Sequence, residues 1–267
     1  MLPSVVTLSG MRTSGWNFEW RGIAVLVRPE HLLISALFGY MSFGLSVSAL
    51  VHIPIVFSGV LLHEMGHALA GRRFGERPFV ELNGWGGLTH WLKGRAFTRG
   101  QSVFVAFAGP LVGIVVGITA LVVNMFLPPG TPPLLLVTIG DIAFVNLGWA
   151  LFNLVPIYPL DGGKIARDLF GHFLGTRGAA WSHASSVAVG VVLIALALFA
   201  RQFFVVLLMG QLTWQNWQAV QAAGPLFRRA GGPSKATTSR VSTKKPHGLR
   251  VIDGGRKDED EKPKYLN

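Results

Sequence analysis

The sequence contains no cysteine among its 267 residues. This absence excludes disulfides, thiolate metal ligands and a cysteine nucleophile, so any metal ligands must be His, Asp or Glu. The N-terminus, MLPSVVTLSGMRTSGWNFEW, lacks a basic segment followed by an apolar core, so we expect no cleavable signal peptide. Charged residues are scarce, at 14% of the chain against about 25% in soluble domains. Apolar residues are abundant instead: half of the chain is hydrophobic and the mean hydropathy is +0.45, which favours a polytopic membrane protein.

The apolar runs predict an all-α membrane protein with about six transmembrane helices, each near the roughly 20 residues that cross a bilayer. The candidate spans are 32–50, 52–71, 101–127, 133–155, 184–200 and 202–220. Between the second and third spans, Asn-Gly and Gly-Gly pairs flanked by short apolar runs predict a membrane-associated β-hairpin. We therefore expect an N-terminal cytoplasmic or interfacial segment (1–30), a membrane-embedded domain (31–223) and a disordered basic cytoplasmic tail (224–267).

The basic residues predict the orientation of the chain. A net charge of +11 suggests nucleic acid at first sight. With six spans and both termini on one side, however, every Lys and Arg before the tail lies on that side except Arg201. The positive-inside rule then places both termini in the cytoplasm of a bacterial cytoplasmic membrane. We expect the basic residues to face anionic lipid, and we do not expect a nucleic-acid partner.

A metal-binding pattern lies inside the second span. Three acidic residues fall within or against the apolar spans, namely Glu64, Asp141 and Asp161, and burying each one costs a few kcal/mol unless it has a partner. In the stretch LLHEMGHAL, His63 and His67 are four residues apart, so on a helix they share one face and can hold one zinc ion. Glu64 is on the same turn and can take a proton from water as a general base. A chance H-E-x-x-H on a surface helix is the alternative.

A catalytic zinc site needs three protein ligands and an open position. The fourth span ends in NLVPIYPLDGG, where two prolines break the helix before Asp161, and irregular backbone at membrane depth is tolerated only inside protein or beside a water-filled cavity. We therefore predict Asp161 as the third ligand of one zinc ion per chain, with a turn-capping aspartate as the alternative. Asn153 can bind a substrate carbonyl or an oxyanion, or it can be a structural amide at the broken helix end.

These two motifs together resemble the site-2 protease family of intramembrane zinc metalloproteases. The residues that carry the resemblance are HEMGH at 63–67 and the second motif N-x-x-P-x-x-x-x-D-G, matched by Asn153, Pro156, Asp161 and Gly162. The resemblance covers roughly residues 30–220 and implies zinc on the two histidines and the aspartate, with the glutamate as base. It implies cleavage of transmembrane segments in single-span regulatory or signal-type proteins, usually after a site-1-type protease has trimmed them. The chain resembles a minimal bacterial-type member without PDZ or CBS domains.

One departure from the family pattern concerns the third span. Relatives often carry G-P-x-x-N there, whereas AGPLVG places Gly113 where the Asn would be. Together with Gly109 and Gly117 it forms a ridge of small residues suited to close helix packing. We expect a change in packing rather than a loss of chemistry.

The predicted hairpin gains a role from the resemblance. A peptide bond inside a helix is shielded, so a substrate must unwind locally before it is cut. The segment Gly86, Gly87, Leu88, Thr89 and His90 can accept the unwound substrate as an added strand. A hairpin that only caps the protein at the membrane interface is the alternative.

Two other functions remain open at this point. A non-proteolytic membrane protein of the same fold can bind transmembrane helices, but it has no need of a general base such as Glu64. A metal transporter is expected to carry polar ligands along its whole pathway, whereas the candidate ligands cluster near one side of the membrane. His52 and His183 lack ligand spacing, so no role is predicted for them.

Overall fold

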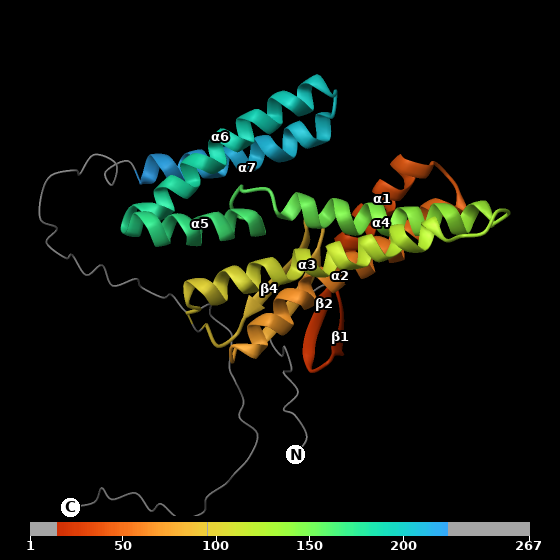
Figure 1. Cartoon of the computed structure of the whole chain (residues 1–267), viewed down its shortest axis with the longest axis horizontal. Coiled ribbons are helices and arrows are strands. Elements are labelled where there is room, and N and C mark those ends of the chain that lie inside the picture. Colours follow the sequence, from red (N-terminus) through yellow and green to blue (C-terminus); the bar gives the residue numbers. More distant parts are fainter. Residues whose placement is uncertain (1–14, 95, 224–267) are drawn as a thin grey trace, which may run out of the picture. The chain divides into compact units, whose positions relative to one another are not determined.

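The structure is a computed structural model that describes residues 15–94 and 96–223 (Figure 1). The predicted tail, 224–267, and residues 1–14 of the predicted N-terminal segment lie outside the described residues. The strands are β1 (Trp16–Trp20), β2 (Ile23–Val27), β3 (Pro78–Asn83) and β4 (Gly86–Trp91). The helices are α1 (Pro29–Phe43), α2 (Val47–Arg73), α3 (Arg99–Met125), α4 (Pro133–Asn153), α5 (Asp161–Leu174), the short 3-10 turn Gly175–Arg177, α6 (Gly178–Phe199) and α7 (Phe203–Ala222).

Four helical stretches of the described residues are long and apolar enough to cross a membrane. They are Val47–Arg73, Arg99–Met125, Pro133–Asn153 and Asp161–Phe199, the last of which contains both α5 and α6. The protein is thus an integral membrane protein. Helices α1 and α7, which correspond to two of the six expected spans, are not among these four stretches. Helix α1 has only 15 residues, and α7 carries several polar amide side chains.

The first expected span, 32–50, is wrong in its extent. Helix α1 ends at Phe43, and Gly44 follows with φ 63°, a left-handed conformation that glycine adopts at little cost. Ser46 then caps α2 by accepting a hydrogen bond from the backbone N–H of Ala49 at 3.3 Å. The apolar run is therefore divided between two helices, because turn and cap chemistry ends a helix where hydropathy does not.

The strand pair between α2 and α3 belongs to a larger sheet than a hairpin. Strands β3 and β4 are antiparallel, β2 is parallel to β3, and β1 is antiparallel to β2. The parallel β2–β3 pair requires a long crossover connection, which α1 and α2 provide. The sheet order β1-β2-β3-β4 leaves β1 and β4 as its two edges.

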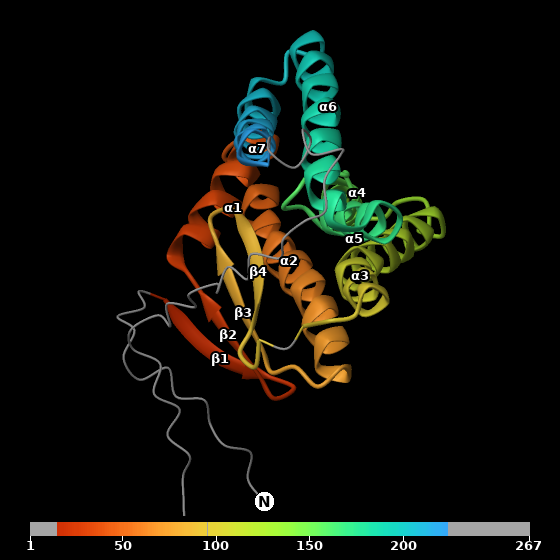
Figure 2. The same cartoon turned by 90° about the vertical axis from the view of Figure 1, so that its left-hand side faces the viewer.

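Helix α2 lies along one face of this sheet (Figure 2). The buried residues of this layer are Ile23, Val25 and Val27 of β2, Val80 and Leu82 of β3, and Val60, Leu61, Met65 and Ala68 of α2. Successive side chains of a strand point to opposite faces of the sheet. Every second residue of β2 and β3 therefore joins this cluster. The helix that carries the histidine motif is thereby held against the sheet.

Helix α3 packs closely on its neighbours through the expected ridge of glycines. A side chain at Gly109 would overlap the imidazole ring of His67 on α2. A Cβ atom at Gly113 would lie 3.0 Å from the backbone oxygen of Asn146, and one at Gly117 would lie 2.5 Å from Cγ of Leu147 on α4. The ridge thus lets α3 approach both α2 and α4, with the tightest approach to α4 at Gly117.

Candidate metal centre

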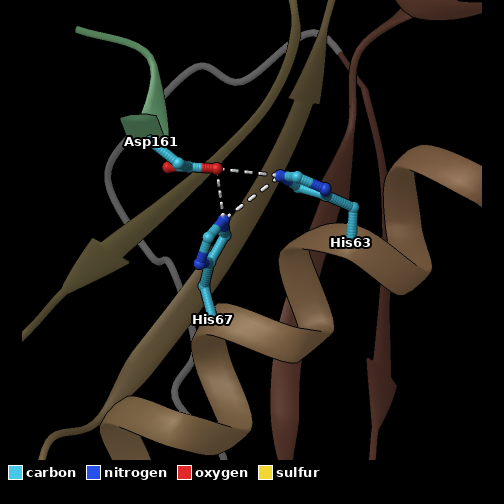
Figure 3. A group of neighbouring side chains, drawn as sticks. All are labelled: His63, His67 and Asp161. Carbon is cyan, nitrogen blue, oxygen red and sulfur yellow. Dashed lines mark hydrogen bonds and ion pairs between the residues drawn. The ribbon is translucent and has the colours of Figure 1, made fainter. Parts of the chain in front are cut away.

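His63, His67 and Asp161 converge on one point (Figure 3). The two histidines lie on successive turns of α2, and Asp161 is the first residue of α5. The Nε2 atoms of the histidines are 3.2 Å apart, and Oδ2 of Asp161 lies 3.2 Å from His63 Nε2 and 3.0 Å from His67 Nε2. All three side chains are buried. Residues almost a hundred positions apart in the chain therefore form one compact group of donor atoms.

The dimensions of this group fit a zinc ion. Zinc binds His nitrogen at about 2.0–2.1 Å in tetrahedral geometry, so two ligand atoms of one ion are separated by about 3.3 Å. The three observed separations of 3.0–3.2 Å are close to this value. Two imidazoles and one carboxylate also form a donor set typical of a catalytic zinc site, which keeps a fourth position open. The residues present therefore fit the ion that the sequence predicts.

Two further contacts orient the ligands. His67 Nδ1 lies 2.6 Å from the backbone oxygen of Val105 on α3. The Nδ1–H group donates to that oxygen, which leaves Nε2 free as a metal ligand. Lys164 Nζ donates to Oδ1 of Asp161 at 2.9 Å, so that Oδ2 remains directed at the histidines. The sequence reasoning missed both contacts; for Lys164, its i+3 spacing from Asp161 on a helix was an available signal.

Glu64 is held by strand β4. Thr89 Oγ1 donates to Oε2 of Glu64 at 2.7 Å. A Cβ atom at Gly87 would lie 2.7 Å from Cδ of Glu64, so only glycine leaves room for this carboxylate. The buried acid demands a polar partner in an apolar helix, and β4 supplies one. The sequence pattern placed Gly87 and Thr89 in a substrate strand and did not reveal their contact with Glu64.

The other candidate site residues occupy different surroundings. Asn153 donates from Nδ2 to the backbone oxygen of Trp149, four residues earlier on α4, at 2.9 Å. His90 lies 3.3 Å from Oε2 of Glu81 and stacks on Phe79. Leu88 is exposed on β4, and Gly86 has φ 121° where a side chain would overlap Trp149.

One buried polar pair was missed by the sequence reasoning. Nδ1 of His52 on α2 lies 2.8 Å from Oδ2 of Asp141 on α4, and both side chains are buried. Asp141 was expected only to need a partner in its apolar span, and no role was predicted for His52. The available signal was that two polar residues in two different apolar spans each require a partner.

The fold and the site together define a class: an integral membrane protein that carries a buried His–His–Asp group of the zinc-hydrolase type. Comparison with known proteins agrees with this class. The model of peptidase family M50 matches residues 134–197. A "Putative zinc metalloprotease" of Synechocystis sp. is 31% identical over 80% of this chain and 57% of its own length. A zinc metalloprotease of Methanocaldococcus jannaschii is 32% identical over 47% of this chain and 37% of its own length.

The fold has a counterpart among solved structures. The site-2 protease from Methanocaldococcus jannaschii matches with a TM-score of 0.56 and 20% sequence identity. The match covers 83% of this chain and 99% of the solved chain. Residues 134–197 thus match the model of peptidase family M50, and the fold of the chain resembles that of a site-2 protease. The chain spans little more than half of the Synechocystis relative and about a third of the other.

Proposed function

We propose that this protein is an intramembrane zinc endopeptidase that cuts transmembrane segments of single-span regulatory or signal-type proteins. The observation that carries the proposal is the convergence on one point of His63 and His67, from the apolar helix α2, and Asp161, the first residue of α5. Glu64, which follows the first histidine, is buried beside them on the same helix. A site built only to bind a metal has no use for this additional carboxylate.

Each residue of the site has a separate role in the proposed reaction. When bound to His63, His67 and Asp161, zinc supplies a Lewis acid that polarises the scissile carbonyl and lowers the pKa of water. Glu64 accepts the proton of the attacking water and passes it to the leaving amine. Thr89 keeps the Glu64 carboxylate in one orientation through its hydroxyl group. Asn153 can stabilise negative charge on the substrate oxygen once its amide turns away from Trp149.

Strand β4 is the proposed docking site for the substrate. It is an edge strand of the sheet, and Gly87 and Thr89 contact Glu64. An unwound substrate segment added to the residues from Gly86 to His90 would therefore run past the base. Edge pairing satisfies the backbone groups that the substrate exposes when its helix opens.

The membrane topology follows from the same proposal. We infer six passes, in which α1 and α7 join the four long apolar stretches, with both termini in the cytoplasm of a bacterial membrane. This topology is supported by the packing of α7 on α6, which turns the Asn216 amide inward. It is also supported by the Lys and Arg distribution, which favours anionic lipid on the cytoplasmic side. A site-1-type protease upstream of this one completes the proposed pathway.

The experiment that tests the proposal compares membrane proteomes from cells that make the wild type or Glu64→Gln at matched levels. Gln preserves the shape of the side chain but cannot accept the proton. Single-span proteins in trimmed form should accumulate only with the variant, and zinc content should be one ion per chain in both proteins. Identical proteomes under both resting and stress conditions would contradict proteolysis and favour a protein of this fold that only binds transmembrane helices.

A further inference from the structure

The broken backbone before Asp161 is attached to two helices that contribute no metal ligand. Backbone groups freed from a helix at membrane depth need partners, and both polar backbone groups of Tyr158 find one. The N–H of Tyr158 donates to Oγ of Ser186 on α6 at 3.1 Å. The backbone oxygen of Tyr158 accepts from Nδ2 of Asn216 on α7 at 2.6 Å. Ser186 and Asn216 are 0% and 1% exposed, so water does not compete for these bonds.

The Asn216 side chain has a single orientation. Its Nδ2 group donates to the backbone oxygens of both Tyr158 and Leu212. Its Oδ1 atom therefore faces His183, whose Nδ1 lies 2.8 Å away on α6 and donates to it. An amide with all of these bonds formed cannot turn without losing several of them, so it is a rigid support for the loop.

The other side of the loop is also enclosed. A side chain at Gly162 would overlap the backbone of Leu154, and one at Gly163 would lie 2.5 Å from the backbone oxygen of Ile157. Ile157 is itself fully buried against Met209 and Leu212 of α7. The loop is thus confined between the start of α5 and the α6–α7 pair. Asp161 follows Tyr158 by only three residues, so a shift of the loop moves its carboxylate.

We propose that Ser186 and Asn216 are positioning residues that hold the Asp161 carboxylate in place for the metal ion. This inference rests on the proposed function, because it takes Asp161 as a zinc ligand. Groups that bond directly to a metal ligand typically change metal affinity by about 10–100-fold when removed. Ser186 and Asn216 act through the Tyr158 backbone, so we expect an effect at the lower end of this range. The two helices would then have a part in the reaction although they lack the family motifs.

The chain offers a matched control one turn away on α6. Ser182 is also buried, at 1% exposure, but its hydroxyl has no hydrogen-bond partner among the described residues. Ser186→Ala and Ser182→Ala each remove one buried oxygen from the same helix. For α7, Asn216→Leu is paired with Gln215→Leu, which removes an exposed amide from the neighbouring position.

The test measures zinc affinity of the purified full chain by competition with a chelator, and the absorption spectrum of the cobalt-substituted protein. Ser186→Ala and Asn216→Leu should raise the zinc Kd by about 10-fold and alter the cobalt spectrum, while both controls match the wild type. Melting of the metal-free protein shows whether each variant is folded. Should Asn216→Leu fail to fold, the two serine variants decide the result.

A double-variant comparison separates positioning from general damage. If Ser186 acts through Asp161, Ser186→Ala has no further effect on zinc affinity in an Asp161→Ala background. Equal zinc affinity in Ser186→Ala and Ser182→Ala, or an undiminished effect without Asp161, would overturn the inference while leaving the proposed function intact. A folded wild type that binds no zinc would overturn the proposed function, and this inference with it.

Discussion

A single methyl group at Gly87 tests whether strand β4 positions Glu64, the proposed catalytic base. An ideal Cβ atom there would overlap Cγ of Glu64 and would lie 2.7 Å from its Cδ and Oε1 atoms, whereas non-bonded carbon atoms rest about 3.5–4.0 Å apart. The Gly87→Ala substitution therefore requires the Glu64 carboxylate and β4 to separate by about 1 Å. The hydrogen bond from Thr89 to Glu64, now 2.7 Å, cannot keep its geometry after such a shift.

The expected loss of activity follows from this displacement. A misplacement of about 1 Å at a catalytic group can cost about 100-fold in rate, so we expect kcat/KM of Gly87→Ala to fall by about that factor. The ion itself should be unaffected, because the atoms nearest to the added Cβ belong to Glu64 and not to His63, His67 or Asp161. Zinc content should remain one ion per chain.

The assay follows cleavage of a purified single-span substrate, taken from the proteome comparison, by protein reconstituted in lipid. The control is Gly148→Ala on α4, since a Cβ atom there meets nothing within 4 Å. Unchanged cleavage by a folded Gly87→Ala protein would refute the idea that β4 positions Glu64. Loss of zinc together with activity would refute it as well, because the damage would then have reached the metal ligands.

Other features of the structure carry predictions of their own. His67→Ala should release zinc, and a chelator should stop wild-type cleavage until zinc is restored; cleavage that survives chelation would contradict a metal role. His52→Leu leaves Asp141 unpaired and should lower the free energy of unfolding by about 1–3 kcal/mol, with partial recovery when Asp141→Leu is added; thermal melting measures both, and additive losses would argue against coupling. Gly117→Leu overlaps Leu147 and should cost about 1–3 kcal/mol; an unchanged melting temperature would show that α3 and α4 can separate freely.

The resemblance to zinc metalloproteases and the three residues of the candidate metal group could be predicted from the sequence because their signals are local. His63 and His67 are neighbours on any helix, and a polar residue in an apolar run needs a reason wherever it lies. The glycine ridge of α3 likewise depends on composition within a few residues. The roles of Glu64, Asn153 and the β4 residues in catalysis remain predictions.

The extent of the sheet and the support of the site could not be predicted in this way. Strand β2 pairs in parallel with β3, which follows it after two helices, and no local pattern specifies that partner. The end of α1 at Gly44 was hidden inside a continuous apolar run. The contact between Glu64 and Thr89 joins a helix to a strand, so it exists only once both are packed.

The sequence by itself therefore determined that this is a membrane protein with an H-E-x-x-H helix and a distant aspartate, because hydropathy and helical periodicity act over a few turns. Only the tertiary structure decided that the three donor atoms lie 3.0–3.2 Å apart and that Thr89 of β4 donates a hydrogen bond to Glu64. It also brought Ser186 and Asn216 to the backbone of Tyr158. Such contacts join residues far apart in the chain, and they form only when packing brings whole helices and strands together.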